Sequence, residues 1–496
     1  MASGLRIPNA TDYGRKTLAD RVIVNPWKRF RRGAASGGIV LCITAVVALV
    51  WANSPLGGWY QTIFHETALG FTIGGMEISH HLSHWVNDAL MAVFFLLVGM
   101  EIKRDVLFGD LHDPRRASLP IVAAIGGMVV PATIYLAINA SALAQGVASA
   151  STRGWGIPTA TDIAFALGIL ALTGKRTPNS LRVFLCSLAI VDDLGALAII
   201  AVFYTDELRM GMLGWSGGVF ALMFVAARLQ IREPRVYALA GVVLLGTLSL
   251  SGIHPTIAGV LVATQIPASA RADASSFVRS TRAAIEYFER HARALRSGRA
   301  SAAMENLTTA QIAAARSIAA SARHIRPPMQ RIEQHLQPWV NFMILPLFAL
   351  ANAGVVLSAE AVGALASPTT LGVVLGLFVG KPLGITVACL VGVKLGLAAL
   401  PRGVTWMHVI GVSMLGGIGF TMAIFITNLS FVPGMPAAAD AATLAILAAS
   451  GLSAVIGLTI LMTRPMERER AREAAAMPAP NPDLLIDDDD QDERGA

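Results

Sequence analysis

Four charged side chains lie inside long apolar stretches of this 496-residue chain: Asp162, the adjacent pair Asp192 and Asp193, and Lys381. A charge at the centre of a lipid bilayer costs about 2.5–3.5 kcal/mol on insertion scales, so such groups are paired with one another, solvated by a cavity or functional. Carboxylate oxygens are ligands of hard cations, and they also bind protons. We therefore expect these residues to form an ion or proton site inside a membrane.

The rest of the chain has the composition of a membrane protein. Hydrophobic residues make up 54% of it and charged residues only 14%, whereas soluble domains carry roughly 25% charged residues. Apolar runs of about 20 residues, each long enough to cross ~30 Å of hydrocarbon, recur along the sequence. We predict an all-α polytopic membrane protein of twelve transmembrane helices, centred near residues 45, 93, 128, 165, 191, 219, 243, 260, 348, 380, 417 and 452.

The basic residues predict the orientation of these helices, because Lys and Arg near span ends stay in the cytoplasm. The segment before the first span is basic, the loop 54–83 has no Lys or Arg, and the alternation continues to Arg464. We therefore expect both termini in the cytoplasm and a multi-pass protein of the bacterial inner membrane. The formal net charge of +7 follows from this topology and does not indicate nucleic-acid binding.

Residues 268–327 interrupt the membrane pattern with ten arginines and four acidic residues. Alanine-rich periodicity around Ile285 and again around Ile312 predicts two short cytoplasmic helices. They are either a solvated hairpin or an arm touching anionic lipid headgroups, where each basic residue contributes about 1 kcal/mol. The expected domains are a basic N-terminal segment (1–36), spans 1–8 (37–267), this insert, spans 9–12 (328–464), and a disordered acidic tail (465–496).

Two smaller features complete the organisation. β-prone residues flank Gly74 and Gly75, which predicts an external hairpin within 57–80. The three cysteines, Cys42, Cys186 and Cys389, lie in apolar spans without metal-binding spacing, so we expect small core residues.

The depth of each charged residue follows from the helical rise of 1.5 Å per residue. Counting from the nearest cytoplasmic loop puts Asp162 about 18 Å deep, Asp192 and Asp193 about 22 Å and Lys381 about 20 Å. The four side chains are therefore expected at one level near the midplane. The aspartate pair has two interpretations: a structural ion pair with Lys381, or an ion site in which one carboxylate pairs with the lysine and the other faces a cavity.

Two helix breaks are predicted at the same depth. Thr161 and Asp162 are favoured helix N-caps before an apolar run, and a cap at this depth requires a helix broken inside the bilayer. Three glycines between Gly416 and Thr421 predict a second break, unless they serve close helix packing. Both breaks fall in the middle helix of a three-span group, spans three to five and ten to twelve, and the groups have opposite orientation. This pattern is typical of inverted repeats with crossed discontinuous helices.

Several motifs together resemble the NhaA-type family of bacterial sodium/proton antiporters. The resemblance extends over residues 37–464 apart from the insert, and its motifs are 98–104 (VGMEIKR), 160–168 (ATDIAFALG), 189–196 (AIVDDLGA), 380–384 (GKPLG) and 417–422 (GIGFTM).

The resemblance implies roles for individual residues. It makes Asp193 the principal sodium ligand with Thr161 contributing an oxygen, Asp192 the partner of Lys381, and Asp162 with Lys381 the charges that compensate the crossed helix ends. It also implies that Glu101, Asp105, Glu333 and His254 sense pH. Asp105 departs from the family pattern, because the family has glutamate at this position.

The function implied is exchange of cytoplasmic sodium, with lithium as a further substrate, for external protons, electrogenic and regulated by pH. No enzyme activity and no cofactor are expected, and the partners are membrane lipids and a second copy bound through the external hairpin. An intramembrane aspartyl protease would need a Gly-x-Gly-Asp site, but the only Gly-Asp is Gly109-Asp110, in a predicted loop. A passive cation channel is disfavoured because Lys381 would repel cations.

Overall fold

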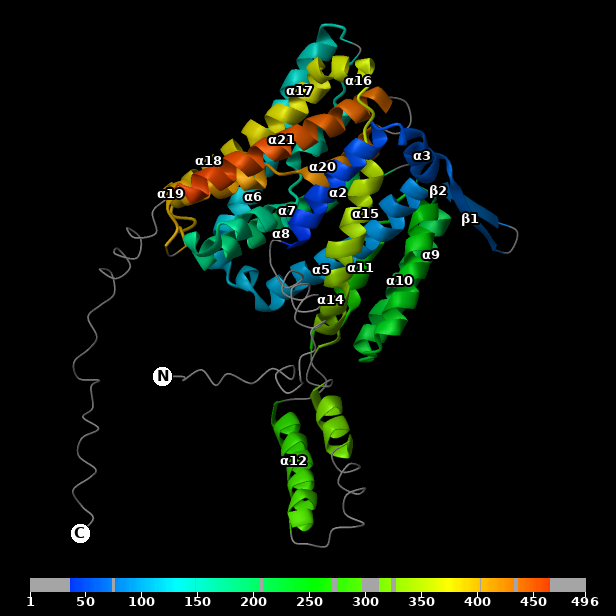
Figure 1. The fold of residues 1–496 in the computed structure, drawn as a ribbon, viewed down its shortest axis with the longest axis vertical. Helices are drawn as coiled ribbons and strands as arrows, with labels where there is room; N and C mark the ends of the chain where they lie inside the picture. Colours follow the sequence, from blue (N-terminus) through cyan, green and yellow to red (C-terminus); the bar gives the residue numbers. More distant parts are fainter. Residues whose placement is uncertain are drawn as a thin grey trace, which may run out of the picture.

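The computed structural model describes residues 36–73, 76–147, 149–205, 208–269, 274–296, 312–322, 327–401, 403–431 and 436–463. Apart from one two-stranded sheet, its elements are helices, which confirms the all-α prediction (Figure 1). The basic segment before Ser36, the turn at Gly74 and Gly75, and the acidic tail from 464 onwards lie outside the described residues.

Among the described residues, eight helices are long and apolar enough to cross a membrane, and two bent helix pairs bring the number to ten. The eight are α4–η4–α5 (Leu82–Phe108), α6 (Pro114–Ala144), η6–α7 (Arg153–Leu172), α8 (Asn179–Phe203), α9 (Met210–Arg228), α10 (Pro234–Ser251), α17–η10–α18 (Pro368–Lys394) and α21 (Pro436–Met462).

The bent pairs are α2 (Ser36–Ala52) with α3–η3 (Gly57–Glu66), and α19 (Trp406–Gly416) with α20 (Phe420–Ser430). The two remaining predicted spans are also helical. They are the nine-residue α11 (Ile257–Gln265) and the continuous helix α14–η8–α15 (Pro328–Asn352). Short turns η5 (Asp110–His112), η7 (Gly174–Arg176), α16 (Ala359–Gly363) and η9 (Ala364–Ala366) connect the helices.

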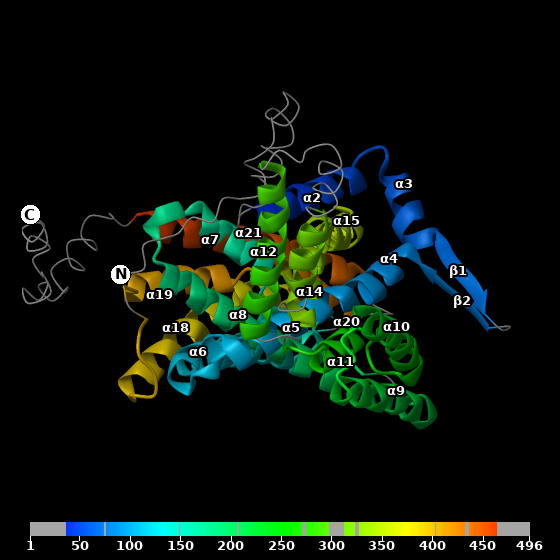
Figure 2. The ribbon, with the colours of Figure 1, turned by 90° about the horizontal axis from the view of Figure 1, so that it is seen from below.

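Helices α6 and α18 lie side by side in both views, on the side of the molecule away from α9 and α10 (Figures 1 and 2). They approach closely because glycines face each other: a Cβ atom added to Gly384 would overlap the backbone of Gly126. Gly127 likewise lies against Ile385 and the Lys381 side chain. Small residues at such contacts allow the backbones of two membrane helices to approach.

Both predicted helix breaks are present. The short helix η6 (Arg153–Thr159) ends before Ala160, and α7 (Ile163–Leu172) begins after Asp162. Helix α19 ends at Gly416 and α20 begins at Phe420, with a bend of 42° between them. Each break therefore divides a span into two half-helices.

The external hairpin is narrower than the predicted range 57–80. Strands β1 (Ala68–Ile73) and β2 (Met76–His81) pair antiparallel, Ala68 opposite His81. Residues 57–66 are helical instead, because the apolar run continues through Tyr60 and Phe64, whose side chains are buried. The hairpin extends away from the helical bundle (Figure 1).

The insert contains the two predicted helices. The first, α12 (Ala274–Arg296), has 23 residues and is longer than predicted, and the second spans Ile312–Ala322. Figure 1 shows both helices beyond one end of the bundle. The three cysteines are free; Cys389 is buried, while Cys42 and Cys186 are half-buried.

Candidate ion-binding site

The two helix breaks cross each other and exchange hydrogen bonds. The backbone nitrogen of Asp162 donates to the carbonyl of Ile418 at 2.7 Å. The hydroxyl of Thr161 donates to the carbonyl of Gly416 at 2.9 Å. Broken helix ends leave backbone groups without intrahelical partners, and here each break satisfies groups of the other. Unwound backbone at membrane depth is thus buried in protein, as it must be.

Asp162 occupies the point where two helix N-termini meet. Its Oδ1 accepts from the backbone nitrogen of Phe165 in α7 at 2.9 Å. Its Oδ2 accepts from the backbone nitrogen of Thr421 in α20 at 3.2 Å and also from the Thr421 hydroxyl. Because helix N-termini carry partial positive charge, one buried carboxylate stabilises both half-helices. Both oxygens of Asp162 are therefore engaged in holding the crossing.

Lys381 places a positive charge at the C-terminal end of the half-helix η6. Its side chain is fully buried, and its Nζ donates to Oδ2 of Asp192 at 2.7 Å. The same ammonium donates to the carbonyl of Thr159, the last residue of η6. A cation at a helix C-terminus is favourable. Lys381 thus joins α18, η6 and α8 through one charged group.

Asp193 is the unsatisfied group of the site. Its side chain is 2% exposed, and neither of its carboxylate oxygens has a hydrogen-bond partner among the described residues. Asp162, Asp192 and Lys381 all lie within electrostatic range of it. An ionised carboxylate buried without a donor or a counter-ion is unfavourable by several kcal/mol. Asp193 is therefore a position where binding a proton or a cation relieves an energetic cost.

Two other oxygens of the predicted site also keep unused lone pairs. Oδ1 of Asp192 is also buried without a partner among the described residues. The Thr161 hydroxyl uses its proton on Gly416, which leaves its lone pairs free to coordinate a cation. Within the described part of the chain, no group of three or more His, Cys, Asp or Glu residues is arranged to hold a metal ion. Carboxylate and hydroxyl oxygens such as these are the ligands that hard cations prefer.

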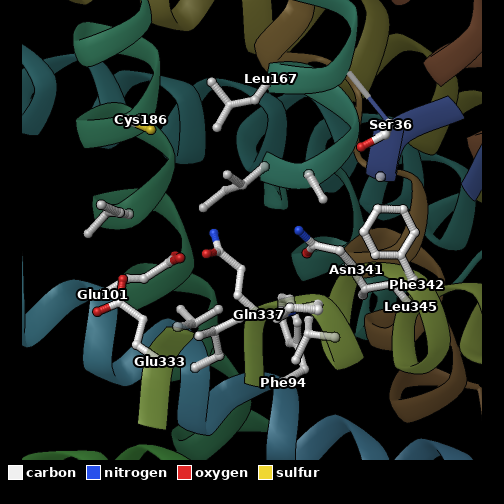
Figure 3. A pocket seen from close by; sticks show the side chains of 18 of the residues that line it. Ser36, Phe94, Glu101, Leu167, Cys186, Glu333, Gln337, Asn341, Phe342 and Leu345 are labelled. Atoms are coloured by element: carbon white, nitrogen blue, oxygen red, sulfur yellow. The ribbon is translucent and has the colours of Figure 1, made fainter. Parts of the chain in front are cut away.

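A cavity of about 680 Å³ leads toward this site from the C-terminal end of α5 (Figure 3). Near the site it is lined by Ile163, which follows Asp162, and Ile190, one helical turn before Asp193. At its other end lie Glu101, Arg104, Asp105 and Glu333. Figure 3 shows the Glu101 and Glu333 side chains close together, with Gln337 and Asn341 projecting into the space.

The structure brings together three of the four candidate pH-sensing residues and separates the fourth. Arg104 forms an ion pair with Glu333 and lies 3.4 Å from Oδ1 of Asp105. Glu101 lines the same cavity. His254 is not part of this group, because its Nε2 lies 3.8 Å from Oδ1 of Asp88, near the other end of the same span.

Sequence reasoning did not identify Arg104 or Thr159 as parts of the site. Arg104 is the last residue of the motif that contains Glu101, and its charge was the available signal. Thr159 takes part through its backbone carbonyl, for which its residue type gives no signal. Cys186, predicted as a core residue, lines this cavity instead.

Comparisons with known proteins find relatives along most of the chain. The profile of a family described as Na+/H+ antiporter 1 matches residues 28–461. The chain is 46% identical over 460 residues to the Na(+)/H(+) antiporter NhaA of Oleidesulfovibrio alaskensis, covering 90% of this chain and 96% of that protein. It is 44% identical over 450 residues to Na(+)/H(+) antiporter NhaA 2 of Sorangium cellulosum, covering 90% and 92%. The Na(+)/H(+) antiporter NhaA of an Escherichia coli O139:H28 strain is 43% identical over 438 residues, covering 88% and 97%.

Proposed function

The chain belongs to the Na+/H+ antiporter 1 family, and we propose that it exchanges cytoplasmic sodium for external protons across the bacterial inner membrane, with lithium as a further substrate. The observation that carries this proposal is Asp193, a buried carboxylate whose two oxygens have no partner among the described residues. Sodium and protons compete for these oxygens, because a protonated carboxylate is a poor ligand for a hard cation. Competition for one group couples the two fluxes.

Asp193 is the principal sodium ligand in this proposal, with Thr161 as a contributing oxygen. Asp192 and Lys381 form the charge-sensitive neighbour, since their 2.7 Å ion pair lies beside the ligand. A sodium ion bound at Asp193 repels the Lys381 ammonium and so weakens the ion pair between Lys381 and Asp192. The three groups titrate as one coupled system and exchange protons together.

Asp162 and Lys381 also support the site as positioning residues. Asp162 is bound to the N-termini of α7 and α20, and Lys381 to the end of η6. These bonds fix the crossing while the two bundles rock around it, as alternating access requires. Import of more than one proton for each sodium exported makes the exchange electrogenic.

The cytoplasmic cavity is the proposed sodium entrance and the place of pH regulation. Glu101, Asp105 and Glu333 surround Arg104 there, so protonation of the carboxylates changes the charge at the entrance. His254, beside Asp88, is proposed to respond to protons from the external side. We further propose cytoplasmic termini, contacts with membrane lipids, and a homodimer formed through the hairpin β1–β2.

The test is sodium-dependent collapse of an acid-inside pH gradient in everted membrane vesicles. We expect the wild type to respond to sodium and to lithium at pH 8, and Asp193→Asn to fail. Asp110→Asn is the matched control, because it makes the same chemical change at a carboxylate 40% exposed in the loop after α5. Absence of sodium-driven proton movement in the wild type would refute the proposal, and full activity of Asp193→Asn would refute the assigned ligand.

A further inference from the structure

One face of α12 carries an unoccupied surface hollow of about 640 Å³. Its lining residues follow the pattern i, i+3, i+4, i+7, i+8, i+11, so they lie along a single side of the helix. They are Ser275, Val278, Arg279, Arg282, Ala283 and Glu286.

The second helix of the insert packs against a different side of α12. The Ser280 hydroxyl donates to the Ser321 hydroxyl at 2.9 Å. Ala284 on α12 and Ala314 on the second helix are both buried. The helix Ile312–Ala322 thus covers the side of Ser280 and Ala284, and the hollow remains on the outside of this hairpin.

The outer face combines positive charge with exposed apolar side chains. Arg279 and Arg282 are exposed, and neither forms an ion pair with a described residue. Val278 is 55% exposed and Ile285 46% exposed. Over residues 268–327, ten arginines against four acidic residues give a net charge of +6. A partner for this face is acidic and carries a short apolar run.

We propose that the outer face of α12 binds the acidic segment 483–493 at the C-terminal end of this same chain. That segment contains seven acidic residues and no basic one. Its apolar run Leu484-Leu485-Ile486 lies between Asp483 and the four aspartates Asp487–Asp490. The apolar run would lie beside Val278 and Ala283, and the flanking aspartates would pair with Arg279 and Arg282.

A long stretch of chain separates the last membrane helix from this segment. The last membrane helix, α21, ends at Met462, whose carbonyl accepts a hydrogen bond from Arg176 in the loop after α7. The twenty residues between Met462 and Asp483 reach at most about 70 Å when fully extended.

The placement of α12 favours this partner over a lipid surface. An amphipathic helix that binds a membrane lies in the plane of the interface. Figure 1 instead shows α12 beyond the end of the bundle and extending away from it. The outer face is thus presented to the solvent.

The test measures binding of a fluorescent peptide of residues 478–496 to the protein in nanodiscs of zwitterionic lipid, by anisotropy. The protein lacking residues 478–496 should bind the peptide saturably, and the full chain should bind it at least about tenfold more weakly, because its own tail competes at high effective concentration. Equal binding to the two proteins would overturn the proposal, as would no binding to either.

Two substitutions locate the contact. In the shortened protein, R279E/R282E should weaken peptide binding about tenfold or more, since both ion pairs become repulsive. R228E/R235E makes the same charge change at exposed arginines of α9 and α10 and should have little effect. Equal losses of peptide binding in the two double variants would mean that the attraction is nonspecific, and the proposal would be overturned. A peptide with Asn at Asp487–Asp490 tests the contact without altering the protein, and it should not bind.

The lipid alternative is decided by repeating the titration in nanodiscs with anionic lipid. The proposal expects the peptide to bind there with only the moderate weakening that surface charge produces. Complete loss of binding would mean that headgroups occupy the arginines, and the proposal would be wrong.

Discussion

Lys381→Met removes the only hydrogen-bond donor that the described residues provide to Asp192. At 2.7 Å and an effective dielectric constant of ~20, the gross attraction in this ion pair is about 6 kcal/mol, most of it offset by the desolvation of both charges. Removing one partner leaves the other charge buried and alone, which costs about 3–5 kcal/mol. An unfolding entropy of ~2.1 cal/mol/K per residue over ~400 residues converts this into a fall in Tm of about 4–6 °C.

The double variant Asp192→Asn/Lys381→Met separates the ion pair from other effects of the substitutions. It leaves no unpaired charge from this pair, so it should lose less stability than the sum of the two single variants, by about 2 kcal/mol or more. Thermal unfolding of the purified protein, followed by intrinsic fluorescence, measures all three. Lys394→Met, at the exposed end of the same helix, should change Tm little. Strict additivity of the two single variants would refute the reasoning that a buried ion pair joins α8 to α18.

Two further predictions concern helix packing and the cytoplasmic cavity. Gly384→Ala should destabilise the protein by about 1–3 kcal/mol, because the added Cβ would overlap the Gly126 backbone. Gly246→Ala is the control: its added Cβ meets open space, so the change should be neutral or stabilising by up to about 1 kcal/mol. Equal shifts in Tm for the two variants would contradict this packing. Arg104→Gln should change the pH dependence of sodium-driven proton movement in everted vesicles, because it removes the cation paired with Glu333. Arg182 lines the same cavity but donates to a backbone carbonyl, so the pH dependence of Arg182→Gln should match that of the wild type. An identical change of pH dependence in both variants would argue against a cluster centred on Arg104.

Local features of the structure could be predicted from the sequence. Asp162 caps α7 as expected, because the capping preference of Asp before an apolar run is a local property. The Gly416–Thr421 break follows from the low helix propensity of glycine. The apolar runs gave the positions of the helices, since a run of about 20 residues reports directly on the thickness of a bilayer.

The contacts between distant segments could not be predicted in the same way. The bond between Asp162 and the Ile418 carbonyl joins backbone groups about 250 residues apart, and a backbone carbonyl leaves no trace in residue type. The bond from Lys381 to the Thr159 carbonyl is of the same kind. The strands occupy only the later part of the range 57–80, because Tyr60 and Phe64 are buried in a helical segment although their residue types favour strands.

In the proposed mechanism, sodium and protons compete for the oxygens of Asp193. It is tested most directly by measuring protons released when sodium is added to the purified protein in weakly buffered solution at pH 8. We expect a saturable release from the wild type, no release from Asp193→Asn, and a release from Asp110→Asn equal to that of the wild type. Sodium binding without proton release in the wild type, or unchanged release in Asp193→Asn, would contradict it.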